Sequence, residues 1–173
     1  QEVAGSGAAV VVLPESALGF WTPTLERLWR EGLQGVSVTV VAGAAVINAN
    51  GYDNVMVAID GGGGRVLYHE RMPVPVSMWR PWERWTGETG GARANLFANP
   101  VVEVAGRKIA PLICYEQLVL WPILQSMLHR LYAFVLGGNR WLTTGGNIRA
   151  SERASAKAWS ALFGVPLVIS FNT

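Results

Sequence analysis

Short, continuous apolar runs recur along this sequence, and they constrain its fold more than any other feature. The clearest are Ala8–Leu13 and Lys108–Ile113. Runs of this kind are typical of strands that are buried on both faces of a sheet. Helical segments alternate with them: Thr22 and Pro23 read as a helix start, and Asn147–Phe163 carries a stripe of small residues. The pattern predicts a layered α/β or α+β domain with buried sheets.

Further strands are expected in the other β-rich apolar stretches, and one more helix where helical spacing returns. The strands are 36–47, 53–60, 65–69, 101–104, 132–136 and 165–171, and the helix is 122–129. Gly61–Gly64 precedes a strand and not a helix, so it is a hairpin turn rather than a phosphate-binding loop. Between Met72 and Asn99 no period is visible, and a loop of this length is usually functional or disordered. No repeat or linker divides the chain, so residues 1–173 are expected to form a single domain.

The charge pattern and the single cysteine exclude several classes of function. The formal net charge is +2 and the 14 basic residues are scattered, whereas nucleic-acid binding needs clustered Lys and Arg. One cysteine cannot form an internal disulfide, and no Cys or His spacing suits a metal site. Nucleic acid, metal and cofactor are therefore not expected. No signal peptide is visible, and because Gln1 is not a natural start the chain is expected to be a fragment.

Two of the predicted strands end in residues that can do chemistry. The first run leads to Glu15, and the second leads to Cys114, which Tyr115 and Glu116 follow. Active sites of α/β proteins lie at strand ends, so this carboxylate and thiol are expected to meet, and the carboxylate would take the thiol proton. That role needs a raised carboxyl pKa, and we expect the thiol pKa to be depressed below about 8.5. Taken singly, Cys114 also fits a buried core thiol, and Glu15 a surface or helix-start carboxylate.

Together these motifs resemble a known family. Val11–Leu18 resembles the first catalytic motif of the nitrilase superfamily, the carbon–nitrogen hydrolases, and Leu112–Glu116 resembles its nucleophile motif. Gly138–Leu142 is similar to the segment after the nucleophile. The order and spacing, with the ending Ser170–Thr173, resemble the apolipoprotein N-acyltransferase branch. Within that branch Met72–Trp79 is most similar to conjugal-transfer proteins of bacterial plasmids.

The resemblance implies a nitrilase-type four-layer αββα sandwich, here expected to lack edge elements at both ends. It also implies a Glu-Lys-Cys triad and a covalent thioester acyl-enzyme. Carried over to this sequence, the base is Glu15, the nucleophile is Cys114, and Glu116 helps to shape the site. Residues near these motifs are candidates for binding substrate. They are Tyr115, Asn139, Trp141 and Trp79.

The family's lysine is missing. Its position falls on Glu70, and the nearest cation is Arg71. The implied task of the lysine is to stabilise an oxyanion, and loss of one such donor typically costs about 2.7–4 kcal/mol. Arg71 could supply charge but not a proton, and backbone N–H groups after Cys114 could supply a second donor. The chain is thus an arginine variant of the triad or a weakened relative, and the presence of Glu15, Cys114 and Glu116 favours retained activity.

Three functions remain open. The leading interpretation is an N-acyltransferase-like enzyme, with an acyl donor, for which a lipid is one candidate, and an amine or water as acceptor. Trp79, Trp82 and Trp85 are interleaved with arginines, which suits a membrane interface, although a packed lid explains them equally well.

The alternatives are a soluble nitrilase-type amidase that hydrolyses a small amide, and a non-catalytic scaffold with a degenerate triad. A role in plasmid conjugation follows only from the likeness to the conjugal-transfer proteins. The branch also implies a bacterial, membrane-associated protein whose membrane segments lie outside this chain. Members of the family often form homodimers, and the sequence leaves the oligomeric state open.

Overall fold

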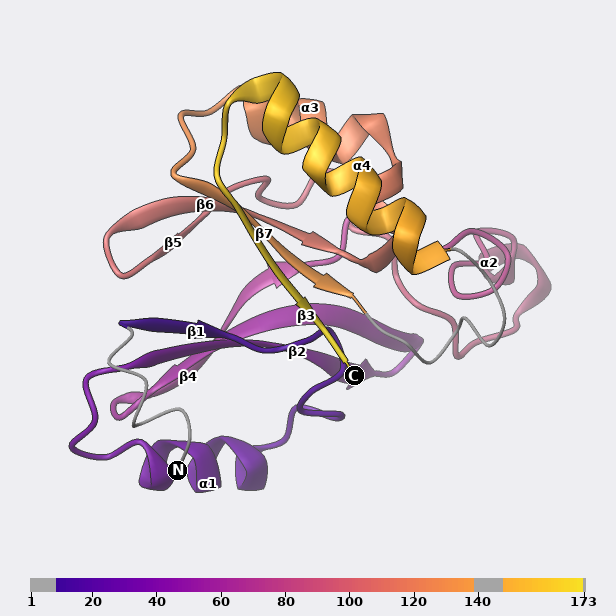
Figure 1. The fold of residues 1–173 in the computed structure, drawn as a ribbon. Helices are drawn as coiled ribbons and strands as arrows, with labels where there is room; N and C mark the ends of the chain where they lie inside the picture. The colour runs from indigo at the N-terminus through magenta and orange to yellow at the C-terminus, as the bar shows by residue number, and fades with distance from the viewer. Residues whose placement is uncertain (1–8, 139–147, 173) are drawn as a thin grey trace.

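Two four-stranded sheets face each other in the computed structural model, which describes residues 9–138 and 148–172 (Figure 1). The first sheet has the order β1 (Val10–Val12), β2 (Thr39–Asn48), β3 (Gly51–Asp60) and β4 (Gly63–His69). The β1 strand is parallel to β2, and the other pairs are antiparallel. The glycine-rich turn between β3 and β4 makes the hairpin that the sequence predicts.

The second sheet contains the strand that carries the cysteine. Its order is β5 (Val102–Val104), β6 (Arg107–Ile113), β7 (Ala133–Gly138) and β8 (Leu167–Phe171). The hairpin of β5 and β6 is antiparallel, and β6, β7 and β8 are parallel. Parallel neighbours place their carboxyl ends at one edge, which is where Cys114 follows β6.

Helices cover both outer faces, so the chain has the four layers α, β, β and α that the family resemblance implies (Figure 1). The α1 helix (Pro23–Gly32) lies on the first sheet, and α3 (Leu120–Met127) and α4 (Ile148–Phe163) lie on the second. The 3-10 helix η1 (Cys114–Leu118) joins β6 to α3, and α2 (Glu83–Thr86) is a single short helix in the long loop. Within the described ranges, no helix is both long and apolar enough to cross a membrane.

Local signals in the sequence account for most element boundaries. Thr22 caps α1 by accepting a hydrogen bond from Leu25 N at 3.2 Å, as the Thr-Pro pair predicts. The β2 strand begins at Thr39 and not at Val36, because the backbone first turns: Val36 N donates to Leu33 O, and Val38 N to Val36 O. These turns replace the predicted start of the strand.

The space between the sheets is filled by apolar side chains from both of them. Val41 and Met56 come from the first sheet, and Ile113 and Val135 from the second, and Tyr68 lies among them. All five are almost fully buried. The two strand ends that carry Glu15 and Cys114 open onto this dry layer, which sets the electrostatics of the site.

Candidate active site

Glu15 is held between the two sheets by close backbone contacts. Leu13 N donates to Val41 O at 2.8 Å, and Gly43 N then donates to Pro14 O at 3.1 Å. A Cβ at Gly43 would overlap the backbone of Glu15, and one at Gly137 on β7 would lie 3.4 Å from Glu15 N. Glycines on both sheets thus allow the chain to bring the Glu15 carboxyl group into the interior.

Cys114 occupies a strained turn at the end of β6. Its φ angle is +44°, in the left-handed region that residues with a side chain rarely adopt. The strain arises where the strand passes directly into η1, and strained residues of this kind cluster at functional sites. The thiol is largely buried, so the turn presents it to the space between the sheets rather than to bulk water.

Two carboxyl groups flank the thiol. Cys114 Sγ donates a hydrogen bond to Oε1 of Glu152 on α4 at 3.7 Å, and Glu15 lies close enough to the thiol for the two groups to shift each other's pKa. Sequence reasoning missed Glu152, which is buried. The sequence does contain a signal for it, because Glu152, Ala156 and Trp159 recur at the spacing of one helix face. In the structure this face packs on η1, where the Trp159 indole donates to Gln117 O at 3.1 Å. A carboxylate on the inward stripe of a helix indicates a functional or paired group.

The electrostatics of the site favour Glu15 as a general base but contradict the predicted pKa of the Cys114 thiol. Burial raises the pKa of Glu15 from 4.5 to about 7, against the opposing effect of the Cys114 thiol. The pKa of Cys114 is also raised, first by burial and then by the negative charge of Glu15 and Glu152. The expected depressed thiol pKa is therefore wrong, because carboxylates and not cations surround the sulfur. Cys114 rests as a thiol, and its proton must leave as attack begins.

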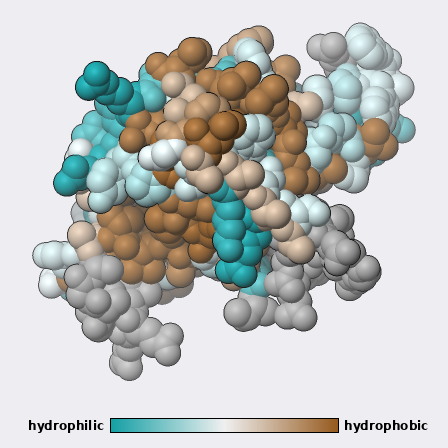
Figure 2. Space-filling model, turned by 45° about the horizontal axis from the view of Figure 1, so that its top comes forward, coloured by the Kyte–Doolittle hydropathy of each residue, from teal (hydrophilic) through white to brown (hydrophobic). Residues whose placement is uncertain are grey.

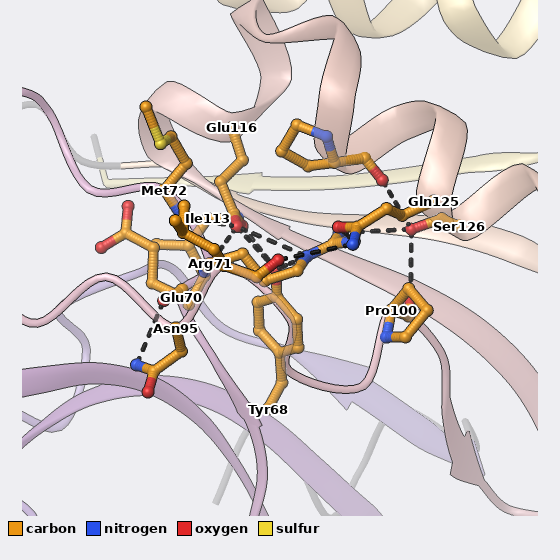
Figure 3. Close-up of polar contacts among 12 residues, drawn as sticks. Tyr68, Glu70, Arg71, Met72, Asn95, Pro100, Ile113, Glu116, Gln125 and Ser126 are labelled. Atoms are coloured by element: carbon orange, nitrogen blue, oxygen red, sulfur yellow. Dashed lines mark hydrogen bonds and ion pairs between the residues drawn. The ribbon is translucent and has the colours of Figure 1, made fainter.

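Glu116 is the hydrogen-bonding centre of the site (Figure 3). The Tyr68 hydroxyl donates to it at 2.7 Å, and backbone N–H groups of Arg71, Met72 and Ile113 donate at 2.7, 3.3 and 2.8 Å. Burial raises the pKa of Glu116, while Arg71 and these donors oppose the rise. One fully buried carboxyl group thereby joins the segment after β4 to the strand that delivers Cys114.

Arg71 is also fully buried, and its guanidinium points toward α3 (Figure 3). It donates to Gln125 Oε1 at 3.0 Å, to Ser126 Oγ at 3.2 Å and to the Tyr68 hydroxyl at 2.8 Å, and it lies 3.7 Å from Glu116 Oε1. These contacts favour a positioning role for Arg71 over the charge-stabilising role that the sequence suggested.

Glu70, at the position of the missing lysine, is completely buried. Its Oε2 accepts a hydrogen bond from Asn54 Nδ2 at 2.8 Å, and its backbone N donates to Asn54 O at 2.8 Å. Its Oε1 has no hydrogen-bond partner among the residues that the structure describes. Burial raises the pKa of Glu70 well above its ordinary value, and the negative charges of Glu116 and Glu15 raise it further.

The remaining candidates lie at different distances from this centre. Tyr115 is half-buried on η1, directly after the nucleophile. Trp79 lines a cavity of about 840 Å³ within the long loop, together with Arg80 and neighbouring residues, and Cys114 is not among its lining residues. Asn139 and Trp141 lie outside the described residues. Within the described ranges, no cluster of His, Cys, Asp and Glu has the arrangement of a metal site.

Comparison with known proteins defines the class. The sequence profile of the carbon-nitrogen hydrolase family matches residues 22–161, so the chain belongs to that family. Among curated proteins, it is 61% identical over 170 residues to the conjugal transfer protein TraB of Agrobacterium fabrum. It is equally identical to a probable conjugal transfer protein TraB of Sinorhizobium fredii. The matches cover 98% of this chain but only 40% and 44% of those proteins.

Solved structures confirm the nitrilase-type fold. An amidase of the nitrilase superfamily from Nesterenkonia, solved as a cysteine-to-alanine mutant, matches 95% of this chain and 63% of its own, with a TM-score of 0.65 and 14% identity. A glutamate-to-glutamine mutant of that amidase, which carries acrylamide added to its active-site cysteine, matches 98% of this chain and 67% of its own, with a TM-score of 0.66. At this identity the likeness concerns the fold alone.

Proposed function

We propose that this chain is the core of an acyl-transfer enzyme with Cys114 as its nucleophile and Glu15 as its general base. The observation that carries the proposal is that a buried thiol lies near a buried carboxyl group, Glu15, whose pKa of about 7 suits proton transfer at neutral pH. In the first step Sγ bonds to the carbonyl carbon of an ester or amide, and Glu15 accepts the thiol proton. The tetrahedral intermediate then expels the alcohol or amine, which takes that proton, and a thioester remains on Cys114.

In the second step an amine or water attacks the thioester carbonyl carbon, and Glu15 again accepts a proton from the attacking group. The carbon–sulfur bond then breaks, and the departing Cys114 sulfur takes that proton from Glu15. An amine acceptor yields an amide, and water yields an acid. Faster discharge of the acyl-enzyme by amines would favour the acyltransferase, and discharge by water alone would favour the amidase. The two outcomes share the same first step, so the thioester is the species to detect first.

The test is to trap the acyl-enzyme with an activated ester. We expect incubation with a p-nitrophenyl ester to add one acyl mass to the peptide that contains Cys114, in a hydroxylamine-sensitive bond. Cys114→Ala should show no such adduct while keeping its circular dichroism spectrum. A folded wild-type protein that is never acylated at this position would leave the non-catalytic scaffold as the better interpretation.

A role in conjugal transfer is the corresponding proposal for the whole protein. It is supported by 61% identity to two TraB proteins over nearly all of this chain. If acyl transfer serves conjugation, Cys114→Ala in the full-length protein should lower plasmid transfer frequency without lowering the amount of protein. An unchanged transfer frequency would show that the role in conjugation does not depend on acyl transfer at Cys114.

We further propose that the site takes a substrate held at a membrane surface, through the outer face of α3. Leu120, Trp121, Leu124 and Leu128 are exposed there, and Phe97 packs edge-on against Trp121 at 6.2 Å. Hydrophobic residues spread across the face where Figure 1 shows α3 and α4 (Figure 2). Exposed apolar patches mark interaction sites, and Trp favours the membrane interface.

Sedimentation with lipid vesicles tests this contact. We expect Trp121→Ser combined with Leu124→Ser to reduce the bound fraction several-fold, because the two changes remove exposed apolar side chains that would enter the lipid interface. Trp85→Ser, in the long loop that the sequence suggested, is the matched control. Equal binding by the α3 variant and the wild type would show that this face does not contact the membrane. A loss of binding only in the Trp85 variant would assign the membrane contact to the long loop.

A further inference from the structure

Glu70 is a buried carboxyl group that the acyl-transfer steps above do not use. We propose that Glu70 is a neutral carboxylic acid whose Oε1 hydroxyl donates a hydrogen bond to the oxyanion formed on Cys114. This inference rests on the proposed function, since it assigns the donor for the same reaction. It places the donor on Glu70 and leaves Arg71 to hold the surrounding backbone.

The backbone geometry places Glu70 beside the nucleophile. Arg71 N and Ile113 N donate to the two oxygens of one carboxyl group, that of Glu116, at 2.7 and 2.8 Å. Glu70 directly precedes the first of these donors in the chain, and Cys114 directly follows the second. The carboxyl group of Glu116 therefore bridges the two short segments, and Glu70 lies close enough to Cys114 that a negative charge on Glu70 would raise the pKa of the thiol.

The hydrogen bonds around Glu70 fix where its proton lies. Asn54 donates to Oε2, so this oxygen is the acceptor of the group. A neutral carboxyl then carries its proton on Oε1. Since Oε1 has no partner in the described part of the chain, the hydroxyl remains available to an oxygen atom that arrives with the substrate.

Burial without a paired cation explains why the group would be neutral. An ionised carboxylate in a dry interior is costly unless a positive charge compensates it. The guanidinium of the adjacent residue, Arg71, hydrogen-bonds Tyr68, Gln125 and Ser126. Four acidic titratable groups in the described part of the chain interact with Glu70, and none of them adds positive charge. They are Glu15, Glu116, Cys114 and Tyr52. A carboxylic acid kept neutral by its surroundings can serve as an oxyanion donor at neutral pH.

Two thiol reagents separate oxyanion stabilisation from thiol activation. With iodoacetamide, Sγ bonds to carbon and iodide leaves, so no charge develops on the carbonyl oxygen. With acrylamide, Sγ bonds to the terminal carbon of the double bond, and the displaced electron pair places negative charge on the amide oxygen. The α-carbon then takes the proton that Glu15 removed from the thiol. The ratio of the acrylamide rate to the iodoacetamide rate therefore measures the oxyanion donor alone.

We expect Glu70→Leu to lower this ratio by about 10²- to 10³-fold, the usual effect of losing one oxyanion donor. Glu70→Gln, which still offers an N–H donor, should keep the ratio within about tenfold of the wild type. In the wild type the ratio should fall at alkaline pH, where Glu70 loses its proton, and in Glu70→Gln it should not. A purely structural role would not produce this difference in pH dependence.

Several outcomes would overturn the assignment. A ratio that is unchanged in Glu70→Leu, or one that is equally pH-dependent in Glu70→Gln and the wild type, contradicts it. If Glu70→Leu does not fold, the pH dependence of Glu70→Gln alone decides. A wild-type Cys114 that reacts with neither reagent overturns the acyl-transfer proposal itself, whereas normal iodoacetamide alkylation with an unaffected ratio overturns only the role of Glu70.

Discussion

Replacing Glu15 with Gln should slow the alkylation of Cys114 by iodoacetamide at pH 7 by about 10²- to 10⁴-fold, the usual contribution of a general base. The reason is that the thiol cannot ionise by itself in this site. Burial and the neighbouring carboxylates raise its pKa, so reaction requires a group that takes the proton as sulfur attacks. Glutamine keeps the shape of the side chain but cannot accept that proton.

The pH profile carries the signature of the base. Glu15 accepts a proton only when ionised, and its pKa is about 7. The wild-type alkylation rate should therefore fall about tenfold for each pH unit below 7 and level off above it. In Glu15→Gln the rate should be low at pH 7 and rise steadily with pH, because hydroxide must then remove the proton. Identical profiles for the two proteins would exclude Glu15 as the base.

Stability provides the control for this substitution. The folded state raises the pKa of Glu15 above its ordinary value of 4.5, so folding binds its proton more tightly. The resulting stabilisation is complete below pH 4.5 and is lost as pH rises through 7. A difference of roughly 2.5 pH units corresponds to about 3 kcal/mol. Glu15→Gln should thus unfold in urea at higher concentration than the wild type at pH 8, which would show that its low reactivity does not come from unfolding.

The sequence predicts the fold and the proximity of Glu15 to Cys114 because both depend on local patterns. Apolar runs locate the strands, and the residues that follow them become the groups at the strand ends. The Thr22-Pro23 pair locates the start of α1, and the structure confirms it. Glu15 and Cys114 meet because their strands lie in facing sheets. This proximity follows from the layered architecture, which the family resemblance implied.

The electrostatic details could not be predicted in the same way, because they depend on which side chains converge in space. Glu70 and Arg71 are adjacent in the chain, but the backbone bends there just after β4, and their side chains contact different parts of the structure. Glu70 contacts Asn54 in the first sheet, while Arg71 reaches Gln125 and Ser126 on α3. The sequence places both near the nucleophile and cannot assign which of them faces it.

Glu116→Ala should be the most destabilising single change at the site. It removes the acceptor of hydrogen bonds from Tyr68, Met72 and Ile113 and leaves the buried Arg71 guanidinium without its carboxylate. Breaking a buried charge pair by removing one partner costs about 3–5 kcal/mol. Urea unfolding at pH 7 measures this loss, and Glu31→Ala on the exposed face of α1 is the control that should change stability by less than about 0.5 kcal/mol.

The converse substitution distinguishes a structural from a catalytic role for Arg71. Without Arg71's side chain, Glu116 still accepts from the Tyr68 hydroxyl and from backbone N–H groups, whereas without Glu116 the guanidinium keeps only neutral partners. Arg71→Met should therefore cost less stability than Glu116→Ala, and the double variant should cost less than the sum of the two. If Arg71 only positions the backbone, Arg71→Met should leave the ratio of acrylamide to iodoacetamide rates near the wild-type value. A ratio that falls about 10²-fold would instead make Arg71 the cation at the oxyanion, in place of Glu70.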